Sequence, residues 1–130
     1  MPFRHWIRTS SFQSLPASTT MKIGLHADHS QTYYGQWFNH EKHNYGKLIN
    51  HRYRTIYEGQ FVRNKKNGHG RLTRPDRHGS MQRSYIGQWK DNQMNGLGTF
   101  YSTPSEYYQG EFLRNKKSGW GRMCYENGDL

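Results

Sequence analysis

The segment YEGQFVRNKKNGHGRL, residues 57–72, carries the pattern from which the fold of this chain can be predicted. Its first half places Tyr57, Gly59 and Phe61 two positions apart. Side chains of an extended strand alternate between its two faces, so these three residues share one face. The first half is therefore expected to be a strand that presents two rings and a bare glycine on one side.

The second half of the segment repeats the two-residue spacing with Gly68, Gly70 and Leu72. Residues 62–67 separate the two halves, and six residues are enough for an open loop but too few for a helix between them. The segment therefore predicts one antiparallel β-hairpin with an open loop of six residues.

The same pattern occurs four times, and we call each copy a row. The rows start at Tyr33, Tyr57, Tyr85 and Tyr108, at spacings of 24, 28 and 23 residues. The outgoing halves contain Tyr33, Gly35 and Trp37; Tyr57, Gly59 and Phe61; Tyr85, Gly87 and Trp89; and Tyr108, Gly110 and Phe112. The returning halves contain Gly68 and Gly70; Gly96 and Gly98; Gly119 and Gly121; and, in the first row, Asn44 and Gly46. Repetition at a near-constant period predicts that these residues form the structural core of a repeat domain.

Two further features recur in each row. A polar residue marks the loop, and an apolar residue follows the glycine pair; these are His40, Asn64, Asn92 and Asn115, then Leu48, Leu72, Phe100 and Met123. The long second row carries its extra residues around positions 74–83, which include Pro75, Asp76 and Gly79. These residues favour turns, so the insertion is expected between hairpins.

Eleven of the 14 glycines occupy the repeated positions. Glycine inside a strand costs about 0.5–1 kcal/mol relative to alanine, so its recurrence indicates that a Cβ would collide with a neighbour. We expect a ring of the neighbouring row to lie flat over each glycine. Four such hairpins predict an all-β fold, with eight antiparallel strands in one elongated, twisted sheet roughly 40 Å long.

The composition is consistent with a core made of rings. A net charge of +10 with 32% hydrophobic residues would by itself favour disorder. Ten Tyr, six Phe and four Trp indicate otherwise, because each large ring can bury roughly 150–250 Å². We therefore divide the chain into an irregular N-terminal arm, residues 1–30, and a repeat sheet, residues 31–130. Met21 is an alternative start that would remove most of the arm.

The row pattern Tyr-x-Gly-x-Trp, a loop and Gly-x-Gly-x-Leu resembles the MORN (membrane occupation and recognition nexus) repeat over residues 33–130. The segments YEGQF, YIGQWKDN, PSEYYQGEF and SGWGRMCYENGDL are similar to a subgroup of this family. Members of that subgroup are associated with sperm, the acrosome and the flagellum, and are described as adaptors for regulatory proteins. The resemblance implies a non-enzymatic scaffold whose partners are axonemal, acrosomal or regulatory proteins.

The chain stops at Leu130, one residue before a further row's tyrosine is expected. Proteins of the resembling subgroup continue with more rows. We therefore expect either a shortened form or a last strand that something else covers. An uncovered last strand would be a site for strand addition or self-association.

No pattern for catalysis or metal binding stands out. The Gly-x-Gly pairs lack the third glycine and the following helix of a nucleotide loop, and the nine acidic residues are dispersed. The pairs His26/His29 and His40/His43 have no cysteine partners for a zinc site, because Cys124 is the only cysteine. We expect no catalytic residue, no metal site and no cofactor.

The loops of the second and fourth rows share the sequence RNKK and contain Arg63, Lys65, Lys66, Arg114, Lys116 and Lys117. If the rows stack, these residues line one edge of the sheet and their fields add. Such an edge would attract anionic lipid headgroups at about 1 kcal/mol per basic residue, or an acidic protein surface. An edge that only keeps the sheet soluble is equally consistent with the sequence. Nucleic acid is disfavoured, because the rings that could stack on bases are needed between the rows.

The expected location follows from the same features. The chain has no signal-peptide hydrophobic core and no stretch near the ~20 apolar residues that span a bilayer. A single cysteine is typical of a reducing compartment. We expect a cytoplasmic protein, and the family resemblance implies association with a cilium, a flagellum or the acrosome.

Overall fold

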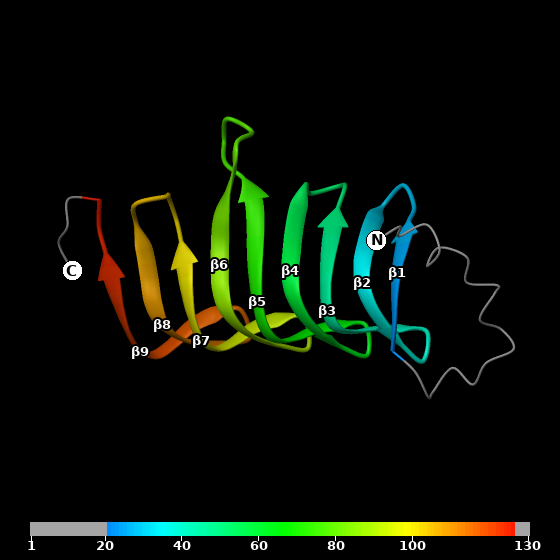
Figure 1. Ribbon diagram of the computed structural model, residues 1–130. Helices are drawn as coiled ribbons and strands as arrows, with labels where there is room; N and C mark the ends of the chain where they lie inside the picture. The colour runs from blue at the N-terminus through cyan, green and yellow to red at the C-terminus, as the bar shows by residue number, and fades with distance from the viewer. Residues whose placement is uncertain (1–20, 127–130) are drawn as a thin grey trace, which may run out of the picture.

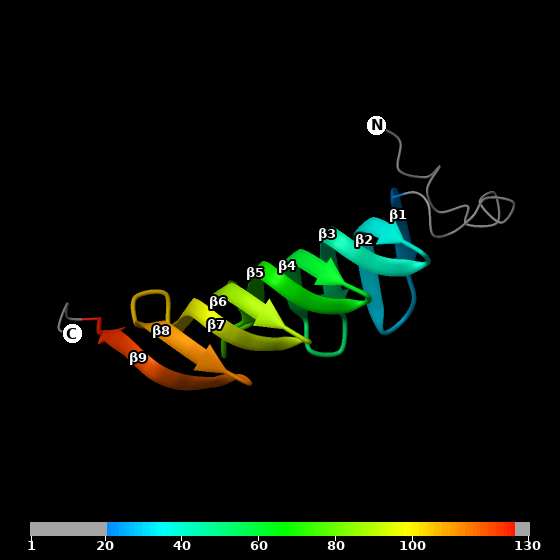
Figure 2. The same ribbon diagram turned by 90° about the horizontal axis from the view of Figure 1, so that it is seen from below.

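A computed structural model describes residues 21–126, which form nine strands in one antiparallel sheet (Figure 1). Each strand pairs with the strands before and after it in the sequence. The strands are β1 Met21–Ala27, β2 Gln31–Phe38, β3 Glu41–Asn50, β4 Thr55–Val62, β5 Lys65–Pro75, β6 Met81–Lys90, β7 Gln93–Tyr101, β8 Tyr107–Leu113 and β9 Lys116–Cys124. The all-β fold and the tandem hairpins are confirmed, and the second view shows the hairpins following one another along the sheet (Figure 2).

The expected irregular arm is wrong for residues 21–27, because these residues form β1 and raise the strand count from eight to nine. β1 pairs with β2 along its whole length and places Gly24 opposite Gly35, as Gly46 lies opposite Gly59 one row later. β1 therefore takes the place of a preceding row's returning strand. It lacks the aromatic signature of an outgoing strand, which is why the row pattern missed it. Residues 1–20 lie outside the described part of the chain.

The turn within each row is shorter than predicted. β4 ends at Val62 and β5 starts at Lys65, so two residues, not six, join them. Arg63 and Asn64 have φ values of 49° and 71°, and the other three rows also have two positive-φ residues at this place. Two consecutive left-handed residues are typical of a type I′ turn, whose twist matches that of the flanking strands. The pairing then begins immediately after the turn.

The glycines have three different roles, only one of which resembles the prediction. A Cβ on Gly70 would overlap the ring of Tyr57, which belongs to the same row and not to the neighbouring row. A Cβ on Gly59 would overlap the backbone of Gly70, so this glycine pair allows the two strands to approach closely. Gly68 instead has a φ of 101°, and Asn44, which replaces it in the first row, has a φ of 63°. Gly68 is thus required by backbone conformation and not by a ring above it.

The rings form a continuous ladder along the sheet. Tyr57 contacts Phe61 of its own row and Trp89 of the next row, with ring centroids 5.1 and 5.2 Å apart and near-perpendicular planes. The same alternation continues through Trp37, Tyr33, Phe61, Tyr57, Trp89, Tyr85, Phe112 and Tyr108. Edge-to-face pairs of this kind contribute about 0.5–1.5 kcal/mol each beyond burial. The ladder is the core of the sheet, and the four row tyrosines in it are at most 8% exposed.

Candidate binding surfaces

The sheet has two faces made by alternate residues of the same strands. The ring face carries the ladder, together with the partly buried Leu48, Leu72, Met94, Phe100 and Met123 that pack against it. The opposite face carries the polar residue that follows each outgoing glycine: Gln36, Gln60, Gln88 and Glu111. Within residues 21–126 no helix and no second sheet covers either face, and no helix there is long and apolar enough to cross a membrane.

Next to each outgoing glycine the pairing with the returning strand changes register, as in a β-bulge. The polar residue of the opposite face forms a hydrogen bond to the returning strand at this place. Gln60 Oε1 accepts a hydrogen bond from the backbone N–H of His69 at 2.6 Å, and Gln88 Oε1 accepts one from Leu97 at 2.6 Å. The residue that donates lies between the two glycines of the returning strand. Its side chain is exposed in all four rows, at Tyr45, His69, Leu97 and Trp120. The hydrogen bond therefore holds the backbone at a position whose side chain is exposed and is not part of the core.

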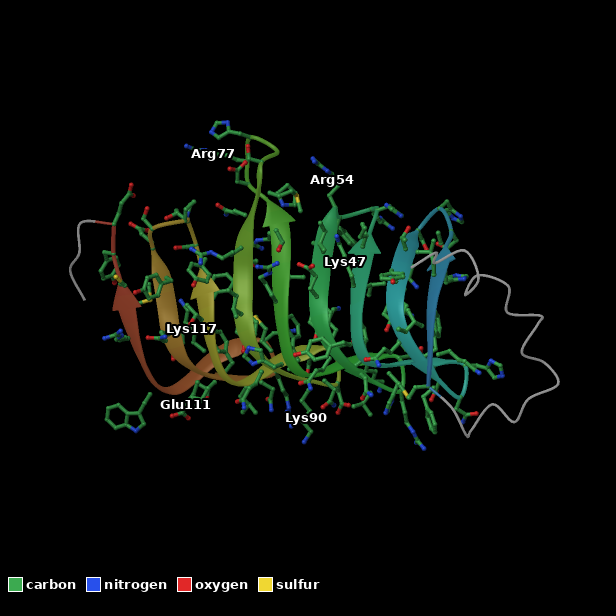
Figure 3. The ribbon with its side chains drawn as sticks, viewed as in Figure 1. Lys47, Arg54, Arg77, Lys90, Glu111 and Lys117 are labelled. Carbon is green, nitrogen blue, oxygen red and sulfur yellow. The ribbon has the colours of Figure 1, made fainter. Side chains whose placement is uncertain are left out.

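The six basic residues predicted as one edge are separated by the structure. Arg63 and Arg114 occupy the first turn position, and all four residues Arg63, Lys65, Arg114 and Lys116 are exposed. Lys66 and Lys117 pair across the hairpin with Phe61 and Phe112 and lie on the ring face, where Lys66 is partly buried and Lys117 is exposed. In the third view Lys90 and Glu111 lie below the curved sheet, and Lys117 lies above them, inside the curve (Figure 3).

The ring-face lysines cover the aromatic ladder. Lys66 Nζ is 5.6 Å from the ring centroid of Tyr57 and 5.8 Å from that of Trp89, so it bridges two rows. Lys42 Nζ lies over two rings of its own row, 5.5 Å from the ring centroid of Tyr33 and 6.0 Å from that of Trp37. Burial lowers the pKa of both lysines, and the charge of Lys42 lowers that of Lys66 further.

Lys42 was not among the residues singled out from the sequence, although a signal for it exists. The ring-face position lies two residues before the first member of each Gly-x-Gly pair, or before Asn44 in the first row. Read at that position, the rows contain Lys42, Lys66, Met94 and Lys117. The repeated RNKK shows only that the turns are basic. The register of the strands identifies which lysine of each RNKK segment faces the rings.

The second turn residue connects each row to the preceding one. Asn64 accepts a hydrogen bond from the backbone N–H of Lys42 at 2.8 Å and donates its own N–H to the carbonyl of Lys42 at 2.9 Å. Asn92 forms the same pair of bonds with Lys66, and Asn115 with Met94. The turn asparagines therefore fix the backbone of the ring-face position in the row before them.

The two long edges of the sheet differ in charge. The edge with the two-residue turns (residues 38–42, 62–66, 90–94 and 113–117, the turn edge) contains the acidic residues Glu41 and Asp91. Its eight basic residues are Lys42, Arg63, Lys65, Lys66, Lys90, Arg114, Lys116 and Lys117. The edge with the connections between rows (residues 28–30, 51–54, 76–80 and 102–106, the loop edge) has three basic and three acidic residues, and Figure 3 shows Arg54 and Arg77 there. The positive charge is therefore concentrated at the turn edge.

The candidate metal residues are dispersed over the described part of the chain. His26 Nε2 lies 3.4 Å from the carboxylate of Asp28, and His43 accepts a long hydrogen bond from the backbone of Arg63. Cys124 is partly buried and carries a free thiol. No three His, Cys, Asp or Glu side chains among residues 21–126 come close enough to hold a metal ion.

Comparison with known proteins identifies the repeat. The family model described as MORN repeat matches residues 33–49, 57–79, 85–104 and 108–130. MORN repeat-containing protein 3 of Xenopus laevis is 32% identical over 88 residues, which are 67% of this chain and 37% of that protein. Alsin of Homo sapiens and of Rattus norvegicus is 27% identical over 114 residues, which are 85% of this chain and 7% of Alsin. The chain thus spans well under half the length of these curated relatives.

Proposed function

Because the chain belongs to the MORN-repeat family, whose repeats are not catalytic, we propose that it is a scaffold that binds other proteins on the open faces of its sheet. The assembly that it would serve is ciliary, flagellar or acrosomal. This location rests on the subgroup resemblance described above, whose representative in the comparison is MORN repeat-containing protein 3 of Xenopus laevis.

One observation carries the proposal. All nine described strands lie in a single layer, and the ladder of rings stabilises that layer without a second layer to cover it. A globular enzyme domain normally buries its sheet against helices or another sheet. Here each strand contributes side chains to two long surfaces that remain free to contact partners. Repeat proteins commonly use such extended surfaces for binding.

Exposed apolar side chains on the opposite face support the same proposal. Leu97 is 62% exposed and Trp120 is 86% exposed, at equivalent positions of adjacent rows. Tryptophan is enriched among the residues that dominate binding energy in protein interfaces. A side chain of this size that is mostly exposed in its own sheet is available for a partner.

Proximity labelling with the tagged full chain in its native cell would test the proposal. The labelled proteins would be assayed for direct binding at low and high salt. We expect at least one defined protein that binds at both, because contacts with apolar residues do not depend on ionic screening. The matched variant Tyr45→Ser, Leu97→Ser, Trp120→Ser changes only exposed side chains and would show whether the opposite face takes part. Labelling no different from that of the free labelling enzyme would refute the scaffold proposal.

The charge of the turn edge favours a second candidate, a peripheral membrane module for anionic phospholipids. Flotation with phosphatidylcholine vesicles, with and without phosphatidylserine, would test it. The variant Arg63, Lys65, Arg114, Lys116→Glu reverses exposed turn-edge charges, and Lys47, Arg52, Arg54, Arg77→Glu reverses the same number of exposed charges elsewhere. We expect the first variant alone to lose flotation if the turn edge binds lipid. Equal flotation of wild type and the turn-edge variant would eliminate this candidate.

A further inference from the structure

We propose that the ring face binds an extended acidic segment of a partner protein, whose carboxylates pair with Lys42, Lys66 and Lys117. This inference rests on the proposed scaffold function and specifies the chemistry of one partner. The observations that carry it are the position of the three lysines, the absence of acidic residues on their face among the described strands, and the spacing of the rows.

Within residues 21–126 the strands place Lys42, Lys66 and Lys117 but no acidic residue on the ring face, and the charge of Asp28, in the loop after β1, only partly offsets the lowering of the pKa of Lys42 by burial. The acidic residues within the strands that carry the rows are Glu41, Glu58 and Glu111, and each is adjacent in sequence to a ring-face residue, so it belongs to the opposite face. Glu58 forms an ion pair there with Arg71 at 2.8 Å. The ion pairs found among residues 21–126 involve none of the three lysines.

The surroundings of Lys66 disfavour its charged form. This lysine is partly buried and lies against the rings of Tyr57 and Trp89. Burial and the like charge of Lys42 both disfavour its charged form and lower its pKa. A bound carboxylate would offset both effects, because an opposite charge within about 4–6 Å favours the charged form. The neighbouring rings add an apolar floor against which the stem of an acidic side chain can pack.

The spacing of the rows sets a sequence requirement for the partner. Each row adds two strands, or about 9.6 Å along the sheet. An extended segment in the polyproline II conformation rises about 3.1 Å per residue with three residues per turn, so one turn spans one row and every third side chain points to the sheet. The ring-face positions in order are Lys42, Lys66, Met94 and Lys117. A matching segment therefore has acidic side chains at its first, fourth and tenth positions and an apolar side chain at its seventh.

Charge complementarity favours a peptide over a membrane as the occupant. Lys42 and Lys66 are partly buried against rings, whereas Arg63, Lys65, Arg114 and Lys116 are exposed at the turn edge, as is Lys117 on the ring face. A lipid surface would meet the exposed residues first. A narrow extended chain can reach the ring face and present single carboxylates to single lysines.

The test uses the full chain and a fluorescent decapeptide with Glu at its first, fourth and tenth positions, Leu at its seventh and Ser or Gly elsewhere, measured by anisotropy. The same peptide in reversed order covers the second direction of binding. A peptide of equal composition with its three Glu residues adjacent is the control for general charge attraction. We expect one of the two spaced peptides to bind about tenfold more tightly than the control peptide.

The third row shows which residue can replace a ring-face lysine. Methionine occupies the ring-face position there, so Lys66→Met is expected to fold, and circular dichroism would verify this. Lys65→Met removes the same charge from the adjacent exposed position. We expect Lys66→Met to weaken the spaced peptide about tenfold and Lys65→Met to weaken it less than about threefold. Lys66→Glu should recover binding of a peptide with Lys at its fourth position.

Equal losses in Lys66→Met and Lys65→Met, or no recovery by the reversed charges, would overturn the inference and leave Lys66 as a cover for the rings. Displacement of the peptide from Lys66 by phosphatidylserine vesicles but not by phosphatidylcholine vesicles would overturn it in favour of lipid. A labelled protein partner that binds wild type and the Lys42, Lys66, Lys117→Met variant equally would also refute the acidic segment. In that case the scaffold function would stand, and its partner would use another surface.

Discussion

The ring face and the opposite face are built from alternate residues of the same strands, yet a tryptophan is buried on one and exposed on the other. Trp89 on the ring face is 6% exposed, whereas Trp120 on the opposite face of the next row is 86% exposed. Trp89 packs between Tyr57 and Tyr85 and donates a hydrogen bond from Nε1 to the carbonyl of Gly70 at 3.1 Å. The comparison shows that a ring stabilises this sheet only where the rows bring another ring beside it.

The largest expected effect is on the ring face. Trp89→Ala should lower the free energy of unfolding by about 3–5 kcal/mol, because it removes a buried ring from between two others. Trp120→Ala should change it by less than about 0.5 kcal/mol, since an exposed surface residue is replaced. Urea unfolding followed by circular dichroism would measure both. Equal stability of the two variants would contradict the assignment of the faces.

The next largest effect is expected at a glycine whose backbone conformation differs from that of an ordinary strand. Gly96 has a φ of 100°, and a Cβ there would also press on the side chain of Gln88. Gly96→Val should cost about 1–3 kcal/mol from backbone strain alone, because a β-branched residue disfavours this conformation. Gly96→Asn should cost less, as Asn44 adopts a φ of 63° at the equivalent position of the first row. Thermal unfolding of the two variants side by side decides the matter, and a more stable Val variant would exclude this cause.

A smaller effect is expected at the turn that positions the ring-face lysine. Asn92→Ala removes the acceptor that bonds the backbone N–H of Lys66 at 2.8 Å. We expect a loss of about 1–2 kcal/mol from the hydrogen bond and from the left-handed turn position. Asn92→Asp keeps an acceptor oxygen and should retain most of the stability. Amide hydrogen exchange at Lys66 would report the change locally, and unaltered protection in the Ala variant would argue against this connection between rows.

A last expected effect is a dependence on alkaline pH. Burial raises the pKa of Tyr85 to about 12, and it also raises the pKa of Tyr33 and Tyr57. In the unfolded chain a tyrosine loses its proton near pH 10, so the contribution of Tyr85 is complete below pH 10 and is lost as pH rises toward 12. The free energy of unfolding, measured in urea, should therefore fall between pH 10 and 12. A flat profile across that interval would mean that the ring-face tyrosines are accessible to water.

Much of this arrangement could be predicted from the residues. The row pattern places Tyr57, Gly59 and Phe61 on one face, and the structure has the two rings in contact there. The interpretation of the glycines was correct in that Gly70 leaves space for a ring, but wrong in assigning that ring to a neighbouring row. Spacing along a strand defines a face, whereas the direction of a ring depends on the bend of the hairpin. β1 was missed because its partner strand, and not its own pattern, makes it a strand.

The candidate binding residues were likewise predicted only in part. Local sequence identified the basic turns, because RNKK is a matter of composition. It did not separate Lys65 from Lys66, since that requires the turn length, and a shorter turn shifts every residue after it relative to the opposite strand. Lys42 escaped notice because no basic run surrounds it, although its register is that of Lys66.

The chain's own period and composition are enough to predict four stacked hairpins and a core of rings on glycine, since the two-residue spacing places rings and glycines on one face and aliphatic residues are few. Only the folded sheet decides which ring covers which glycine, that β1 completes the first edge, and that Lys66 faces the rings while Lys65 faces water. These outcomes depend on where one strand ends and the next begins to pair, and on contacts between rows that are far apart in sequence.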